Sequence, residues 1–220
     1  MATPEGIDPA LLKEARAEVT EARARLERLD EHSLDVLFRK ARSHHTWLDR
    51  PVTDEDIHRL YDVFKWGPTS TNGNPARFVF VRSEEQKEKL STCVAEGNVN
   101  KVLASPLIAI VAYDVNFWEH MHYLFAHVDM TGRYRGNPEY TETTAFRNSS
   151  LQGAYMMLAA RALGFDIGAL SGFNNAAVDE AFFKGTTLKS NFLCNIGYAD
   201  VDGLFPRLPR LAFDDACQVI

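Results

Sequence analysis

The sequence of 220 residues has no long apolar run. No uninterrupted stretch reaches the roughly 18 residues that a membrane-spanning helix requires, and the N-terminal segment carries acidic side chains without the apolar centre of a secretory signal. We therefore expect no membrane partner. The composition, 45% hydrophobic and 25% charged, is that of an ordinary folded protein, and the length favours one substantial domain.

Cysteine and excess positive charge are also scarce. The three cysteines, Cys93, Cys194 and Cys217, form no CxxC pair and cannot all pair within one chain, which suits a reducing compartment and predicts a cytoplasmic location. The net charge of -6 argues against a nucleic-acid partner, because phosphate backbones are bound by clustered Lys and Arg.

Several well-known catalytic and nucleotide-binding motifs are missing. The chain contains no GxGxxG after a strand, no GxxxxGK[ST], no HExxH and no GxSxG. These absences argue against a Rossmann-type site for stably bound NAD. Any chemistry must therefore rest on other residues.

The N-terminal region predicts one amphipathic helix of residues 1–32, appended to a body of residues 33–220. Asp8 can cap this helix, and Pro9 suits its first position. Its narrow stripe resembles a coiled-coil seam, but packing on its own domain or on a partner subunit gives the same pattern, and a free coiled coil needs more than three heptads. We therefore favour packing. The stripe consists of Leu12, Ala15, Val19, Ala22, Leu26 and Leu29.

The body mixes helices and strands without regular βαβ alternation, which predicts an α+β domain. We expect a short helix from Ser33, a capped helix from Thr53 to Trp66, a helix over 84–94 and a long core helix over 143–163 ended by Gly164. Strands are expected over 77–82, 107–113 and 191–198; the second is apolar enough to be covered on both faces. The segment 116–140 has no clear period and suits a lid or a loop over a pocket.

Polar residues gather in four patches between these elements. Ala41–Trp47 combines a guanidinium, a hydroxyl and imidazoles, which can grip a phosphate, although cations near a helix C-terminus can simply complement its dipole. The loop 66–77 crowds hydroxyls and amides together, either as an ordinary turn or as a site for a polar, planar ligand. A glycine-rich link over 164–173 permits close approach of backbone to a ligand, and Arg207 and Arg210 add two cations.

In combination and order, these patches resemble the nitroreductase superfamily of FMN flavoproteins, from about residue 33 to the C-terminus. The phrases Lys65-Trp-Gly-Pro-Thr-Ser70, Thr144-Ala-Phe-Arg-Asn-Ser-Ser150 and Asn195-Ile-Gly-Tyr198 are most similar to its subgroup of malonic semialdehyde (3-hydroxypropanoate) reductases. The resemblance implies a mostly antiparallel central sheet flanked by helices. It also implies an intertwined homodimer with FMN at the subunit interface.

The resemblance assigns cofactor-binding roles residue by residue. Arg42 and Ser43 match the family's phosphate and ribityl motif, and Arg210 matches its C-terminal phosphate-binding cation, with Arg207 as the weaker candidate. His45 stands where many members have Arg, which leaves open whether His44 or His45 contacts the cofactor. The remaining residues match the loop at the isoalloxazine, the backbone near the reactive face of the flavin, and the core helix that reaches the cofactor from the neighbouring subunit. They are Pro68, Thr69, Ser70 and Asn72; Leu170, Ser171 and Gly172; and Asn148 and Gln152.

The function that the resemblance implies is a ping-pong oxidoreductase. NADH or NADPH reduces the flavin at N5, and a small acceptor such as malonic semialdehyde, a nitroaromatic or a quinone then takes the reducing equivalents. No dedicated catalytic side chain is expected, because the cofactor carries the chemistry. Fold similarity alone leaves the acceptor open.

Two other functions stay open. One is a flavin-binding redox sensor without catalytic turnover. The other is a zinc hydrolase built on His120, His122, His127 and Asp129, since histidine and carboxylate ligate zinc. We expect no metal, because these residues lack a familiar ligand spacing.

Overall fold

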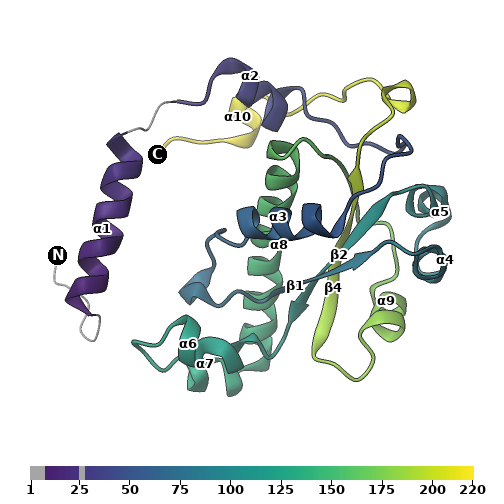
Figure 1. The fold of residues 1–220 in the computed structure, drawn as a ribbon. Helices are drawn as coiled ribbons and strands as arrows, with labels where there is room; N and C mark the ends of the chain where they lie inside the picture. Colours follow the sequence, from purple (N-terminus) through teal and green to yellow (C-terminus); the bar gives the residue numbers. More distant parts are fainter. Residues whose placement is uncertain (1–7, 25–27) are drawn as a thin grey trace.

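The computed structural model describes residues 8–24 and 28–220. Its centre is a four-stranded antiparallel sheet in the order β1-β2-β4-β3, between two layers of helices (Figure 1). The predicted α+β class with an antiparallel sheet is confirmed. The strands are β1 (Ala76–Val81), β2 (Leu107–Asp114), β3 (Asp166–Leu170) and β4 (Leu188–Gly197).

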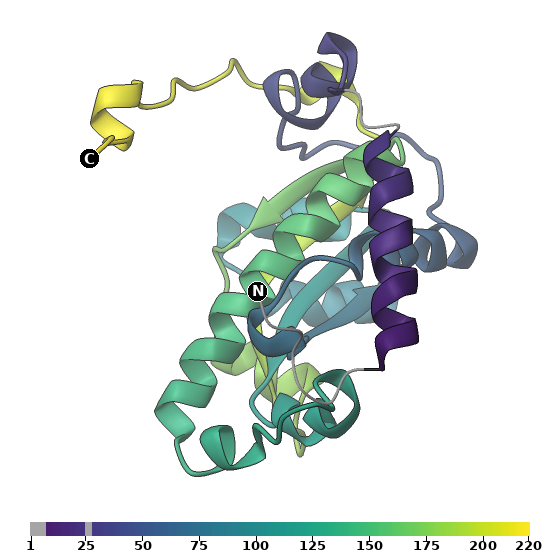
Figure 2. The same ribbon diagram turned by 90° about the vertical axis from the view of Figure 1, so that its left-hand side faces the viewer.

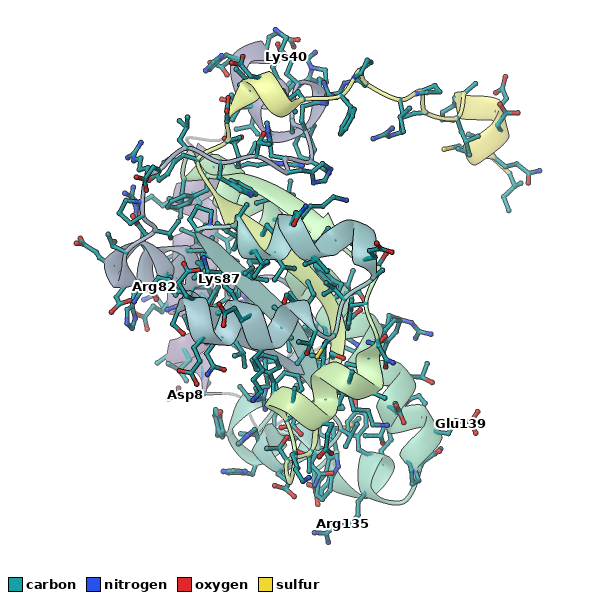
Figure 3. All side chains as sticks on the ribbon, turned by 90° about the vertical axis from the view of Figure 1, so that its right-hand side faces the viewer. Asp8, Lys40, Arg82, Lys87, Arg135 and Glu139 are labelled. Atoms are coloured by element: carbon teal, nitrogen blue, oxygen red, sulfur yellow. The ribbon has the colours of Figure 1, made fainter. Side chains whose placement is uncertain are left out.

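Strand β2 lies at the centre of the core, as its apolar sequence predicts. Every residue of β2 is buried, and its side chains alternate between the two faces of the sheet. Ala109 and Val111 face α3 (Asp54–Phe64) and α8 (Pro138–Ala162). Ile108 and Ile110 face the other layer, which consists of α4 (Glu84–Ser91), α5 (Glu96–Leu103) and α9 (Asn175–Phe182) and is turned to the viewer in Figure 3.

Helix α8 approaches the sheet closely at Gly153. A Cβ atom at this position would lie 2.5 Å from Cζ of Phe192 on β4, so only glycine fits without movement of the ring. The helix begins at Pro138, with Asn137 as its cap, five residues before the predicted start. Its N-terminal turns have no apolar stripe because they pack beside α7 (Thr131–Arg135) and the polar loop before β1.

Three elements differ from the sequence predictions. The link 164–173 contains strand β3, whose glycine and short length hide its strand character. The helix predicted over 84–94 ends at Ser91, and α5 follows as a separate helix. Helix α9 was not predicted. The predicted capping box at the start of α3, formed by Thr53 and Asp56, is confirmed.

The segment 116–140, left unassigned by its sequence, folds into three short helices before α8. They are η3 (Phe117–His120), α6 (Met121–Leu124) and α7. The region before the sheet likewise forms α2 (Glu31–Leu34) and the single π-helical turn η1 (Asp35–Arg39), where a short helix was expected from Ser33. Two further 3-10 turns are η2 (Ser70–Asn72) and η4 (Val201–Gly203).

Helix α1 (Pro9–Ala24) lies to one side of the sheet in Figure 1, and the C-terminal segment extends away from the core in Figure 2. The helix is capped by Asp8, which accepts the N–H of Ala10 at 2.8 Å as predicted, but α1 buries no residue. Packing of α1 on its own domain is therefore not observed, and Leu26 lies outside the described residues. The C-terminal segment with α10 (Phe213–Ala216) is exposed. None of the helices that the structure describes is long and apolar enough to cross a membrane.

Candidate functional site

The Arg42–His45 loop lies along the outer edge of β3. Ser43 pairs in parallel with Ile167, and the backbone N–H of His44 donates to the Ile167 carbonyl at 2.9 Å. This contact uses the free hydrogen-bonding edge of an edge strand. A Cβ atom on Gly168 would lie 2.2 Å from the carbonyl oxygen of His44, so glycine is required for this approach. The first and third predicted patches therefore meet at β3.

His44 is the buried side chain of this loop. Its Nε2 lies 3.3 Å from Asp166 Oδ1, while Asp166 Oδ2 accepts the N–H of Ala199. Burial lowers the pKa of His44, and the negative charge of Asp166 opposes the shift without reversing it. The Nδ1 atoms of His44 and His45 are buried without a hydrogen-bond partner among the described residues. Such atoms are rare in folded proteins and mark a place for a further polar group.

The C-terminal segment crosses the same loop. Arg42 donates to the carbonyl of Phe205, and Arg207 donates from Nη2 to the carbonyl of Ala41 at 2.8 Å. Arg210 instead donates to the Leu208 and Pro209 carbonyls of its own segment. The structure thus brings Arg207 next to Arg42, although Arg210 was the stronger candidate from the sequence.

Helix α5 adds two polar residues that the sequence analysis missed. Asn98 donates from Nδ2 to the carbonyl of Gly172 at 3.0 Å, and Lys101 donates to Asn98 Oδ1 at 2.9 Å. Burial, followed by the charge of Lys101, lowers the pKa of His45. Asn98 and Lys101 therefore connect the end of β3 to the Arg42–His45 loop. No motif marks these residues, and only the tertiary contact reveals them.

The three predicted residues at the end of β3, Leu170, Ser171 and Gly172, present different groups to a ligand. The side chain of Leu170 belongs to the core, so only its backbone is available to a ligand. Ser171 is exposed. A Cβ atom on Gly172 would lie 2.6 Å from Nδ2 of Asn98, so the glycine lets α5 approach.

Helix α8 holds residues 68–74, the central part of the second predicted patch, through hydrogen bonds. Asn148 Oδ1 accepts the backbone N–H of Ser70 at 2.8 Å, and Gln152 Oε1 accepts the N–H of Ala76 at 2.9 Å. Both side chains are buried. Within the described residues, Asn148 and Gln152 therefore position the loop of their own chain, whereas Pro68 and Ser70 remain exposed at its tip.

The same loop holds an unusual backbone conformation. Thr71, Asn72 and Asn74 have φ values of 51°, 51° and 42°, which non-glycine residues rarely adopt. Thr69 accepts the N–H of Asn74, and Asn72 donates from Nδ2 to the carbonyl of Leu124. Strain of this kind persists only where surrounding contacts hold it, and it occurs frequently at ligand sites.

The two groups of predicted residues lie at opposite edges of the sheet. Arg42, Ser43, His45 and Leu170–Gly172 adjoin β3, whereas the 68–74 loop leads directly into β1. Strands β4 and β2 lie between these edges, at a spacing of about 4.8 Å per strand. One chain therefore presents the predicted residues in two separate groups, one at each edge of the sheet.

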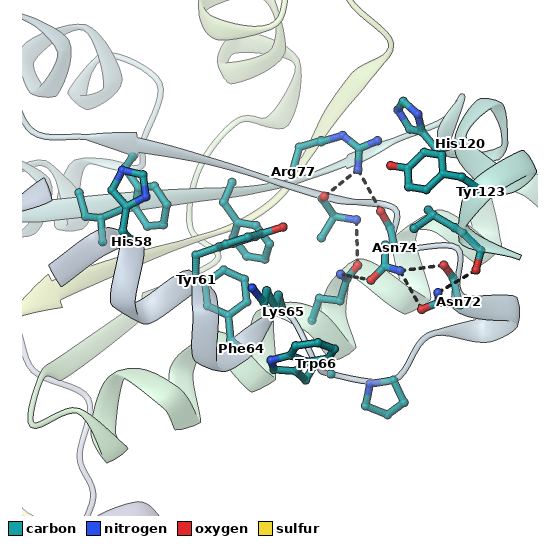
Figure 4. A pocket seen from close by; sticks show the side chains of 18 residues that line it. His58, Tyr61, Phe64, Lys65, Trp66, Asn72, Asn74, Arg77, His120 and Tyr123 are labelled. Atoms are coloured by element: carbon teal, nitrogen blue, oxygen red, sulfur yellow. Dashed lines mark hydrogen bonds between the residues drawn. The ribbon is translucent and has the colours of Figure 1, made fainter. Parts of the chain in front are cut away.

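A cavity of about 860 Å³ lies between α3, β1 and the short helices of segment 116–140 (Figure 4). His120, Tyr123 and Leu124 form part of its wall, which confirms the expectation that this segment lies over a pocket. Arg77 is held by the carbonyls of Asn74 and Ala76 and by Asp114 Oδ2 at 3.0 Å. The described lining includes no acidic residue but four basic or imidazole residues, namely His58, Lys65, Arg77 and His120.

The histidines of segment 116–140 do not gather as metal ligands. His122 Nδ1 contacts the carbonyl of Glu119, and the ring of His127 packs at a tilt against the ring of Phe125. Across the residues with described positions, no three His, Cys, Asp or Glu side chains come close enough together to hold a metal ion. The zinc-hydrolase hypothesis therefore has no structural support.

Both the sequence and the fold of the chain match known proteins. The sequence profile of the nitroreductase family matches residues 38–198. The chain belongs to the nitroreductase family. A Rhodopseudomonas palustris protein provisionally named NADH dehydrogenase/NAD(P)H nitroreductase is 56% identical over 192 residues, which cover 87% of this chain and 98% of the relative.

Solved structures show the same nitroreductase-family fold. A protein of Bacillus subtilis, provisionally described as a nitroreductase, has a TM-score of 0.79 at 21% identity, covering 87% of this chain and 100% of that chain. Another from Exiguobacterium sibiricum, solved in complex with FMN, has a TM-score of 0.73 at 22% identity over 89% of this chain and 99% of that one.

Proposed function

We propose that this nitroreductase-family chain is an FMN-dependent NAD(P)H oxidoreductase. The observation that carries the proposal is the group at the β3 edge, where Arg42, Lys101 and Arg207 lie near the loop that holds the unpaired Nδ1 atoms of His44 and His45. Cations and N–H donors suit a phosphorylated cofactor rich in hydrogen-bond acceptors. A structure with the same fold was solved with FMN. When bound, FMN would supply hydride transfer between NADH or NADPH and an acceptor.

The chain's own residues would bind and orient this cofactor. Arg42, Ser43 and Arg207 would hold the phosphate, with Arg210 as a further candidate. His45, Leu170, Ser171 and Gly172 would meet the remainder, together with Lys101 and Asn98. The exposed tip at Pro68, Thr69, Ser70 and Asn72 would close the site, positioned by Asn148 and Gln152.

We propose a homodimer because each chain presents two half-sites at opposite sheet edges. A two-fold axis that brings the β3 edge of one chain to the β1 loop of another would complete two equal sites. Exposed apolar side chains support such an interface: Trp66 is 78% exposed, and Phe146, Leu151 and Tyr155 lie exposed on α8. Sedimentation equilibrium tests this proposal, and a monomer at micromolar concentration would contradict it.

We propose that the large cavity receives the acceptor. Its described lining contains Lys65 and Arg77, each paired with a carboxylate outside the lining, and no acidic residue. These N–H donors support an anionic acceptor such as malonic semialdehyde over a neutral quinone or nitroaromatic compound. Phe64, Phe78 and Phe80 give part of the lining an apolar, aromatic character. The division into an extension of residues 1–32 and a flavin-binding body of 33–220 remains a proposal, as does the cytoplasmic location.

The decisive experiment is anaerobic spectroscopy of the purified protein. We expect a yellow protein that NADH or NADPH bleaches and that an acceptor panel of malonic semialdehyde, a nitroaromatic and a quinone restores. Protein that neither carries nor takes up FMN would contradict the proposal. Flavin that binds but is not reduced by either dinucleotide would instead favour the redox sensor.

A further inference from the structure

A second, smaller cavity lies between η1 and the C-terminal end of α8. Its volume is about 200 Å³, and its charged lining consists of Arg42, Arg161 and Asp166. It opens beside Ala41, whose carbonyl accepts the hydrogen bond from Arg207. The cavity thus adjoins the proposed phosphate-binding residues, but Arg161 belongs to none of the motifs identified in the sequence.

Arg161 is half-buried and has one direct protein partner in the described chain. Its Nη1 donates to the carbonyl of Leu37 in η1 at 3.0 Å. Burial lowers the pKa of its guanidinium, and the nearby charge of Arg207 acts in the same direction, against the charge of Asp166. A guanidinium remains charged in proteins, so this burial carries an electrostatic cost.

The positive charges around this cavity exceed the negative ones. Over residues 8–24 and 28–220, no carboxylate lies within 4.0 Å of the guanidinium nitrogens of Arg42, Arg161 or Arg207. Asp166 is the one acidic residue of the described lining, so a single carboxylate faces the guanidiniums of Arg42 and Arg161 there. A helix C-terminus accounts for one stabilised cation. Here two guanidiniums, those of Arg42 and Arg161, line the cavity, and a third, that of Arg207, donates to the carbonyl of the lining residue Ala41. Three guanidiniums in and beside one cavity favour a bound anion.

We infer that Arg161 is a third phosphate-binding cation, which holds a phosphate monoester in this cavity together with Arg42 and Arg207. The inference rests on the proposed function, and the ligand is the terminal phosphate of FMN. Arg161 also fixes η1 through Leu37, so that the Ala41–Arg42 backbone is held beside the same anion.

The test compares FMN with riboflavin, which lacks the phosphate. Apoprotein affinity for each is measured by quenching of flavin fluorescence, in the wild type and in Arg161→Gln and Arg161→Met. Glutamine keeps a donor for Leu37 but removes the charge. The control is Lys40→Met, which removes a cation that is 79% exposed outside the cavity lining and labelled in Figure 3. Thermal unfolding confirms that each variant is folded.

We expect both Arg161 variants to weaken FMN binding about 10- to 100-fold, as loss of a hydrogen bond to a charged group predicts, with riboflavin binding unchanged. Lys40→Met should change neither by more than about twofold, because exposed charges are screened. Equal losses for FMN and riboflavin would reduce Arg161 to a structural residue and overturn the inference, as would unchanged FMN affinity.

The inference and the proposed function can fail separately. Should wild-type protein bind neither flavin, the proposed function fails, and inorganic phosphate then tests the cavity through the melting temperature. If phosphate raises the melting temperature of the wild type but not of Arg161→Gln, the anion site is supported. If phosphate does not raise the melting temperature of the wild type, the anion site is overturned. Should phosphate stabilise the wild type while FMN binds no better than riboflavin, the assignment to the flavin phosphate is overturned.

Discussion

The carbonyl oxygen of His44 lies 2.2 Å from the position that a Cβ atom on Gly168 would occupy. Real Cβ atoms do not come this close to a carbonyl. Any other residue at position 168 must therefore displace the loop that carries Arg42 and Ser43. The conformational freedom of glycine is secondary here. The missing side chain is what allows the loop to pair with the sheet edge.

We therefore expect Gly168→Ala to destabilise the fold by roughly 1–3 kcal/mol, the usual cost of an overpacked site. It should also weaken FMN binding, because the loop moves away from β3. Urea unfolding and flavin titration measure the two effects. Gly97→Ala in α5 is the matched control, since a Cβ there meets nothing within 4 Å. Wild-type behaviour of Gly168→Ala would contradict the required contact.

Asn148→Ala should loosen the 68–74 loop without disturbing the core helix. The substitution removes the acceptor of the Ser70 N–H, at a net cost of about 0.5–1.5 kcal/mol, since Ser70 is exposed and water can take its place. Hydrogen exchange of the loop amides should accelerate, and flavin affinity should fall. Thr143→Ala, an exposed change on the same helix, serves as the control. Unaltered exchange in the loop would show that Asn148 does not position it.

Stability should decline as the pH falls below about 6.5, because unfolded histidine takes up a proton near that value. Burial lowers the pKa of His44 and of His45 in the folded protein, so the unfolded chain binds more protons below this pH. The free energy of unfolding is then largest above pH 6.5 and decreases towards acid. Urea midpoints at pH 7.5, 6.5 and 5.5 measure this trend. Replacement of His44 by Asn should flatten it, and an equal slope in both proteins would disprove the assignment.

Arg207→Ala should weaken FMN binding more than Arg210→Ala does. Arg207 reaches the carbonyl of Ala41, next to Arg42, whereas Arg210 contacts its own segment. Loss of a charge-assisted contact predicts about a tenfold or greater increase in Kd for Arg207→Ala. Fluorescence titration at fixed salt gives both values. The reverse order would mean that Arg210 serves the phosphate, as the resemblance alone suggested.

Local sequence predicted the elements whose signals are local. The apolar run of β2 and the capping box at Thr53 need no distant partner to be recognised. Strand β3 was missed because Gly168 serves a contact with His44, far away in sequence. Sequence spacing could not predict this contact.

The candidate site was likewise predictable only where motifs mark it. The Arg42–His45 and 68–72 patches stand out by composition, but Asn98 and Lys101 lie on a helix whose sequence gives no such sign. The choice between Arg207 and Arg210 depended on the path of an irregular C-terminal segment. Asn148 was predicted to reach the cofactor from the neighbouring subunit, and within its own chain it accepts the N–H of Ser70.

The separation of the two half-sites on opposite sheet edges has a genetic consequence. If the proposed homodimer forms, a chain with a damaged Arg42–His45 loop and a chain with a damaged 68–74 loop should each be inactive alone. When the two are refolded together, the mixed dimer should combine one doubly damaged site with one site in which both contributing edges are intact. Activity recovered from two inactive variants would then show that each site takes residues from both subunits, one chain complementing the other.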